Sequence, residues 1–503
     1  MSKRPVLTMI LLAALATSSA SAQRLGGVGG TIGSVGGQLG STVGRVTGTV
    51  GGAVGGTVQG TTGGVGGIVG GPIGSSLSQT GGTLGGSVTR ASSGRLLTGS
   101  RIAYGKTSGS DSDGGSGLAD LVQTSSLDDL TPVTGYLYLS IGQMADVRRL
   151  RHEALIRANR KTLDGDEYGQ PVRKGELIAT DPDAASLAAA QRAGFQIVGV
   201  EADNILGVRI VTLAPPRGMN VRKSLQALRR AAPALQADYN YIYEPAGGAL
   251  LPALGVTLAA SSTARRGTRI AMIDGGIAAH PSFANATIEQ RGFAGEAQPT
   301  GHGTAVGSLL VGDQGPFRGA ARGAQLFVAD VYGGDPAAGS ATAIVRALAW
   351  AASKQPSVIN ISLIGPDNSA MARAISALRA RGIAVVAAVG NDGPAAPPQY
   401  PASYPGVLAV TGVDAADRAL REAGNAPHLD FAAPGADLVA ALPGSGFTPV
   451  RGTSFAAPFV AARLAATGSA MKLAGEAVPG KGRVGRGIVC RTCRILPKVV
   501  GLK

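Results

Sequence analysis

Short apolar runs alternate with helical patterns from Thr268 onward, and no other feature of the chain constrains its fold as strongly. A continuous apolar run is typical of a strand that is buried on both faces of a parallel sheet. Repeated strand–helix units favour a parallel sheet covered by helices on both faces. We therefore predict an α/β fold. The predicted strands are 269–273, 324–331, 357–363, 383–389 and 407–413, and the predicted helices are 341–353 and 369–381.

Polar side chains follow two of these predicted strands. In open α/β sheets the functional site lies beyond the carboxyl ends of the strands. Asp274, with two glycines behind it, comes directly after the first strand, and Asn391 follows the run 383–389. A carboxylate there can orient a catalytic base, and an amide can donate to an oxyanion. Taken alone, Asp274 is more typical of a helix cap or a turn, and the segment around Asn391 is also typical of a plain turn.

The chain offers a narrow choice of catalytic base and nucleophile, because it has four histidines. His302 is flanked by small residues and precedes an apolar run, which predicts a tightly packed helix start. Ser454 also lies between small residues before an apolar helical run, where free helix N–H groups are available to an oxyanion. The other three histidines lie in a predicted basic helix or in loops: His152, His280 and His428.

Taken together, these segments resemble the subtilisin-like serine proteases, the subtilase family. The order Asp, His, Ser along the chain is the order of subtilisin. The resemblance covers residues 265–470 and rests on Gly301-His302-Gly303-Thr304, Gly452-Thr453-Ser454-Phe455-Ala456-Ala457-Pro458, the strand 358–363 and the segments 400–405 and 432–435. It implies a subtilisin-like parallel sheet and a serine-type endopeptidase that cuts proteins or peptides through an acyl-enzyme.

The resemblance also implies a role for each site residue. Ser454 attacks the peptide carbonyl, His302 accepts and returns the proton, and Asp274 holds the tautomer of His302. The Asn391 side chain and the Ser454 N–H group stabilise the oxyanion. The residues that lie along the substrate are Ser362, Leu363 and Ile364.

Two residues depart from the pattern of the family or bear on specificity. Ile364 stands where the family usually has Gly, so its side chain is expected to narrow the pocket for the residue before the cut bond or to shift the strand. Asp392, next to the oxyanion Asn391, is expected to favour basic substrate side chains.

Residues 118–248 have an ordinary composition, and 174–245 reads as β-α-β-β-α-β, the order of a ferredoxin-like module. A basic helix is predicted at 144–161. By resemblance, this region is a propeptide that assists folding, docks on the protease as its own partner and inhibits it. We expect cleavage near 245–265, in or beside a linker at 249–266 that precedes a protease domain at 267–470.

The N-terminal segment predicts export. Lys3 and Arg4 precede a short apolar run, and Ala20-Ser21-Ala22 is typical of a signal-peptide cleavage site. Residues 1–22 are thus a predicted signal peptide, which places the chain in the periplasm, on the cell surface or outside the cell. The apolar run is too short to span a bilayer. Residues 23–117 are Gly-rich and are interpreted as a disordered tether or as a β-repeat that binds a surface or polysaccharide.

The remaining features limit cofactors and partners. The net charge is +15, but no Lys/Arg block with interleaved aromatic residues indicates nucleic-acid binding. No cofactor is predicted; the resemblance implies that structural calcium is possible, but no acidic loop is specific enough to assign a site. Residues 471–503 form a predicted basic tail, in which Cys490 and Cys493 are expected to form a disulfide. Two alternatives remain: a non-catalytic scaffold with a vestigial protease domain and a functional Gly-rich arm, and a hydrolase of another acyl bond.

Overall fold

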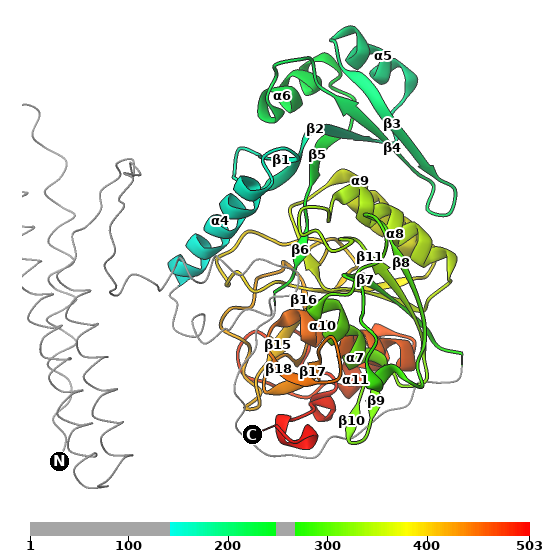
Figure 1. Cartoon of the computed structure of the whole chain (residues 1–503), viewed down its shortest axis with the longest axis vertical. Coiled ribbons are helices and arrows are strands. Elements are labelled where there is room, and N and C mark those ends of the chain that lie inside the picture. The colour runs from blue at the N-terminus through cyan, green and yellow to red at the C-terminus, as the bar shows by residue number, and fades with distance from the viewer. Residues whose placement is uncertain (1–140, 248–266, 503) are drawn as a thin grey trace, which may run out of the picture. The chain divides into compact units, whose positions relative to one another are not determined.

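The computed structural model describes residues 141–247 and 267–502, and two sheets carry the fold of these residues (Figure 1). The predicted signal peptide at 1–22, the Gly-rich segment at 23–117 and the linker at 249–266 lie outside the described residues. Among the described helices, none is both long enough and apolar enough to cross a membrane.

A parallel sheet of seven strands lies at the centre of the protease part, in the order β16-β15-β14-β12-β7-β11-β8. All neighbouring pairs are parallel, which confirms the predicted α/β sheet. Two strands, β8 and β16, were not predicted; β8 lies at an edge and alternates exposed polar side chains, so it lacks a continuous apolar run. The strands are β7 (Arg269–Asp274), β8 (Thr287–Gly292), β11 (Gln325–Asp330), β12 (Val358–Ile361), β14 (Ala384–Ala388), β15 (Leu408–Val413) and β16 (Leu429–Pro434).

Helices cover both faces of this sheet (Figure 1). On β7, Ile270 and Met272 pack in the core that contains α7 (Gly301–Val311) and α10 (Thr453–Thr467). The alternate residues Ala271 and Ile273 pack with α8 (Ala341–Ser353) and α9 (Ser369–Ala380). Each fully buried aliphatic side chain contributes about 1.5–3 kcal/mol. Burial on both faces explains why the central strands read as continuous apolar runs.

The second sheet belongs to an antiparallel α+β module whose main strands are ordered β5-β2-β4-β3. Its elements follow the predicted β-α-β-β-α-β order. Asp183 and Asn220 are N-caps rather than first helical residues, because their side chains accept hydrogen bonds from the first turns. The elements are β2 (Pro171–Thr180), α5 (Ala184–Arg192), β3 (Gln196–Asp203), β4 (Val208–Ala214), α6 (Val221–Ala231) and β5 (Ala237–Tyr241).

Two elements precede the module. Helix α4 (Ile141–Ala158) corresponds to the predicted basic helix and begins and ends three residues earlier than predicted. Strand β1 (Leu163–Gly165) pairs antiparallel with the first residues of β2.

One predicted strand ends early and another is divided in the structure, and one pairing accounts for both. The run 237–243 ends as a sheet strand at Tyr241, after which the Tyr243 N–H group donates to the Gly339 carbonyl at 2.8 Å. The chain then continues as β6 (Glu244–Pro245), which pairs antiparallel with β13 (Leu363–Ile364). The run 357–363 is therefore split into β12 and β13, because its end pairs with the segment from the module.

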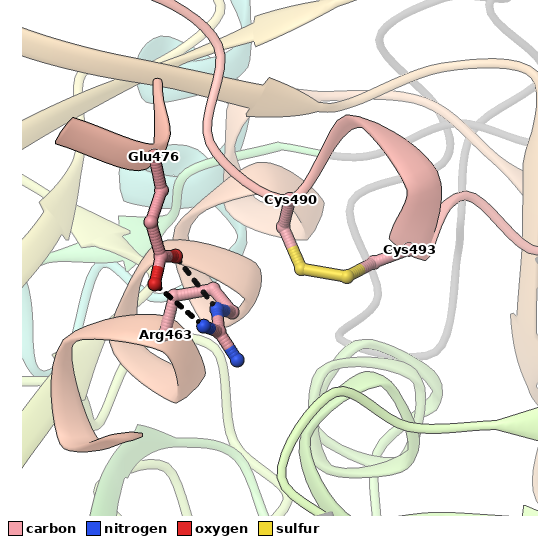
Figure 2. Close-up of a disulfide and its surroundings, with 4 residues drawn as sticks. All are labelled: Arg463, Glu476, Cys490 and Cys493. Carbon is pink, nitrogen blue, oxygen red and sulfur yellow. Dashed lines mark hydrogen bonds and ion pairs between the residues drawn. A yellow bond between two sulfur atoms is a disulfide. The ribbon is translucent and has the colours of Figure 1, made fainter. Parts of the chain in front are cut away.

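The C-terminal residues pack onto the protease part. Helix α11 (Ala470–Glu476) follows α10, and Glu476 forms a double ion pair with Arg463 of α10 at 3.0 and 2.7 Å. Figure 2 shows this pair beside the disulfide Cys490–Cys493, which confirms that prediction. Shorter elements complete the described chain: β9 (Asp313–Gln314), β10 (Phe317–Arg318), β17 (Leu438–Ala441), β18 (Phe447–Val450), and the 3₁₀ turns η2 (Pro281–Phe283), η3 (Arg491–Cys493) and η4 (Pro497–Val500).

Candidate functional site

Asp274 and His302 meet where β7 ends and α7 begins. Asp274 is the last residue of β7, and His302 is the second residue of α7. The Nδ1 atom of His302 lies 2.8 Å from Oδ1 of Asp274, and both side chains are buried. A carboxylate at Nδ1 fixes the imidazole ring and leaves Nε2 as the atom that can accept a proton. Within residues 141–247 and 267–502, Nε2 has no hydrogen-bond partner.

Two glycines allow this close approach. A Cβ on Gly275 would lie 2.4 Å from Oγ1 of Thr300, the N-cap of α7. A Cβ on Gly303 would lie 2.3 Å from the Gly275 carbonyl oxygen. A larger residue at Gly303 would push the start of α7 away from the backbone after β7, and one at Gly275 would require the Thr300 side chain to move. The small neighbours of the aspartate and the histidine therefore determine the distance between the two side chains.

Ser454 is the second residue of α10 and is fully buried. Its hydroxyl donates to the carbonyl oxygen of Gly247 at 2.5 Å. The serine is therefore engaged with the chain segment that follows the α+β module, and not with the imidazole of His302. In the described structure, the acceptor of this hydroxyl is thus a backbone carbonyl of the chain itself.

Asn391 directs its amide at the same segment. Its Oδ1 accepts the Thr453 N–H group at 3.0 Å, which fixes the orientation of the carboxamide. Its Nδ2 then donates to the carbonyl of Ala246 and, at 3.0 Å, to that of Gly247. Since Thr453 begins α10, this contact joins the Asn391 turn to the helix that carries Ser454.

The three residues predicted to lie along a substrate run beside the same segment. The Ala246 N–H group donates to the Ser362 carbonyl at 2.8 Å, and Leu363 and Ile364 form the β13 side of the antiparallel pair. The Ser362 hydroxyl donates to the Ser454 carbonyl at 3.0 Å. Five of the seven predicted site residues thus contact residues 244–247: Ser362, Leu363, Ile364, Asn391 and Ser454. The Asp274–His302 pair joins this group through α10, because the centroid of the His302 ring lies 5.5 Å from that of Phe455, the residue after Ser454.

Asp392 is occupied by α4. Arg148 and Arg151 contact its carboxylate at 3.1 and 3.2 Å, and the side chain is almost fully buried. The sequence predicts that Asp392 favours basic substrate side chains, and in the structure basic side chains of the chain itself contact it.

Glu244 belongs to the same charged cluster. Arg151 and His152 contact it at 2.9 and 3.0 Å. Burial raises the pKa of the Glu244 carboxyl, but the charges of Arg151, His152 and Arg148 outweigh burial and hold the pKa well below its ordinary range. The sequence predicts the basic helix but not its ion pairs with Glu244 and Asp392, because these two residues are distant from the helix in the chain.

The module also caps two helices of the protease part. The Asp238 carboxylate accepts the Ser369 N–H group at 2.7 Å, at the start of α9. Asn240 exchanges hydrogen bonds with Thr342 at the start of α8, both at 3.3 Å. A carboxylate is favourable at a helix N-terminus, where unpaired N–H groups point outward. The described residues hold no group of three or more potential metal-ligating side chains.

The subtilase family model matches residues 265–476. Subtilisin BL from Lederbergia lenta is 33% identical over 205 residues, which cover 39% of this chain and 74% of that protein. The chain belongs to the subtilase family. The major intracellular serine protease of Bacillus subtilis (strain 168) is 32% identical over 214 residues, covering 39% of this chain and 67% of that relative.

A solved structure shares the fold of this subtilase. Fervidolysin from Fervidobacterium pennivorans, a keratinolytic enzyme related to subtilisin, aligns with a TM-score of 0.54 and 19% identity. The alignment covers 64% of this chain and 60% of fervidolysin. At this identity the likeness concerns the fold alone. The family and its relatives make this subtilase a serine endopeptidase with a subtilisin-like fold.

Proposed function

We propose that this subtilase cuts peptide bonds with Asp274, His302 and Ser454 as its catalytic triad and Asn391 as an oxyanion donor. One observation carries the proposal: a serine hydroxyl and an asparagine amide converge on the same backbone segment, and a histidine held by a buried aspartate packs against Phe455, the residue after that serine. Subtilisin-type acyl transfer needs each of these groups.

The proposed reaction begins with attack of Ser454 Oγ on the peptide carbonyl carbon. His302 Nε2 takes the hydroxyl proton and later gives it to the leaving amine, while Asp274 stabilises the imidazolium. Asn391 Nδ2 and the Ser454 N–H group stabilise the negative oxygen. For attack, the Ser454 hydroxyl hydrogen has to leave the Gly247 carbonyl and turn to Nε2.

The second part of the proposal is that the chain is a self-processing zymogen. Residues 244–245 pair with β13 as an added strand, residues 246–247 contact Asn391 and Ser454, and the module that precedes them caps α8 and α9. Such a segment excludes other substrates for as long as it stays bound. The α4 contacts with Glu244 and Asp392 add to this inhibition.

Export completes the proposal. It rests on the signal-peptide pattern of residues 1–22, and it places the enzyme in the periplasm, at the cell surface or outside the cell, where it meets protein or peptide substrates.

The test compares the wild type with Ser454→Ala, both expressed in a protease-deficient host. We expect a fluorophosphonate to label only the wild type, casein to be hydrolysed only by the wild type, and N-terminal sequencing to find a cut near residue 247 only in the wild type. Equal processing of the variant would reject self-cleavage. A wild type that takes no label would favour the non-catalytic scaffold, and labelling without casein hydrolysis would favour another acyl substrate.

A further inference from the structure

Ile364 of β13 lies beside the proposed binding position of the substrate residue that precedes the cut bond. We propose that this subtilase accepts only alanine or glycine at that position, and that Ala246 is the natural occupant during self-cleavage of the Ala246–Gly247 bond. The inference rests on the proposed catalytic roles and deepens them by naming the substrate class.

The strand register identifies Ala246 as that residue. Pro245 lies opposite Leu363 in the antiparallel pair, and the next residue, Ala246, donates its N–H group to the Ser362 carbonyl at 2.8 Å. The Ala246 carbonyl in turn accepts from Asn391 Nδ2. Gly247, with φ of 77°, leaves the extended conformation. Regular pairing therefore ends at Ala246, beside Ser454.

The pairing also places the Ile364 and Ala246 side chains on one face. Residues opposite each other in an antiparallel pair point to the same side, and residues two positions apart in a strand share a side. Ile364 lies opposite Glu244, and Ala246 is two residues beyond Glu244. Ala246 and Ile364 are 1% and 5% exposed and belong to the same buried core.

The far wall of this space is Gly390, directly before Asn391. Two carbon atoms of Ile364, Cδ1 and Cγ2, lie 3.3 Å from the position that a Cβ on Gly390 would take, and Gln399 approaches the same position at 3.5 Å. The isoleucine side chain thus occupies the volume between β13 and Gly390. A substrate side chain larger than a methyl group would have to displace it, and overpacking of this kind costs about 1–3 kcal/mol.

The proposed self-cleavage needs only groups of this chain and one water molecule. Oγ of Ser454 bonds to the carbonyl carbon of Ala246, and the bond from that carbon to the Gly247 nitrogen breaks. The serine proton passes through His302 to the Gly247 nitrogen, which leaves as an amine. Water then hydrolyses the ester, which yields an Ala246 carboxylate and regenerates the Ser454 hydroxyl.

The first experiment follows self-cleavage in the full chain. We expect the wild type and Ala246→Gly to yield a new N-terminus at Gly247, and Ala246→Phe to be cut about ten- to a hundredfold more slowly at this bond. Adding Ile364→Gly to Ala246→Phe should restore the cut, because the pocket is reopened. A new N-terminus at Gly248, or equally fast cutting of Ala246→Phe, would overturn the proposal.

The second experiment uses peptides of the form acetyl-Tyr-Glu-Pro-Xaa-para-nitroanilide, with enzyme concentration set by fluorophosphonate titration. For the wild type, kcat/KM with Ala or Gly at Xaa should exceed that with Phe by about ten- to a hundredfold, and Ile364→Gly should abolish or invert this ratio. An enzyme that takes the label but hydrolyses the Phe peptide equally well refutes the pocket assignment alone. An enzyme that neither takes the label nor cuts any peptide refutes the catalytic proposal beneath it.

Discussion

If the chain is cut after Ala246 as proposed, the contacts of Arg151 predict how tightly the released propeptide, here called the pro-region, stays bound to the protease part. The Nε atom of Arg151 donates to Glu244 at 2.9 Å, and its terminal nitrogen lies 3.2 Å from Asp392. Substitution Arg151→Met removes the charge and keeps much of the apolar stem. Helix α4 then loses a link to the substrate-like segment and a link to the turn beside the oxyanion donor.

The expected loss of binding free energy depends on the ion pairs that remain after Arg151→Met. A hydrogen bond to a charged group contributes about 1.5–3 kcal/mol. Arg148 still contacts Asp392, and His152 still contacts Glu244, so neither carboxylate is left unpaired. The Arg151 side chain is also 25% exposed, which reduces its contribution. We therefore expect a loss of about 1.5–2 kcal/mol, which is roughly 10- to 30-fold in the dissociation constant of the pro-region.

The assay measures peptide hydrolysis by the processed enzyme over a dilution series, since dilution releases the bound pro-region. The half-activation concentration gives the dissociation constant. Arg149→Met is the matched control: it lies on the same helix, is 56% exposed, and its described ion pairs are with Asp146 and Glu153 of α4 itself. It should change the constant less than about twofold. Equal effects of Arg151→Met and Arg149→Met would refute the reasoning, because α4 would then not act through this cluster.

Three further predictions follow from the site. Asn391→Ala should lower kcat about 10²–10³-fold, measured with the Ala peptide, and an unchanged kcat would mean that its amide does not face the oxyanion. Gly303→Ala places a Cβ 2.3 Å from the Gly275 carbonyl oxygen, so it should lower both activity and melting temperature, while Gly475→Ala on α11, whose Cβ would meet open space, should lower neither. The pKa of Glu244 lies below its ordinary value of 4.5, so its charge stabilises the docked state above that pH and less as the pH falls below it. In a Ser454→Ala background, the melting-temperature difference caused by Glu244→Gln should thus be full at pH 7 and shrink below pH 4.5, and a difference independent of pH would argue against the ion pairs.

The central strands and helices were predictable because burial on both faces leaves a plain signal in the sequence. The strands β7 and β14 and the helix α8 agree with their predicted ranges to within a residue. The edge strand β8 has no such signal, since one side of it faces solvent. The end of β5 at Tyr241 could not be predicted either. It depends on the pairing of β6 with β13, which joins segments far apart in the chain and leaves no local pattern in the sequence.

The sequence by itself determined which groups can perform the chemistry: a serine and a histidine among small residues, an aspartate after a buried strand and an asparagine in a turn. Those are properties of local composition and chain order. Tertiary structure alone decided that residues 244–247 lie on Ser454 and Asn391, that Arg148 and Arg151 meet Asp392, and that Ile364 covers Gly390. These contacts join residues far apart in the chain, and long-range packing rather than any local pattern brings them together.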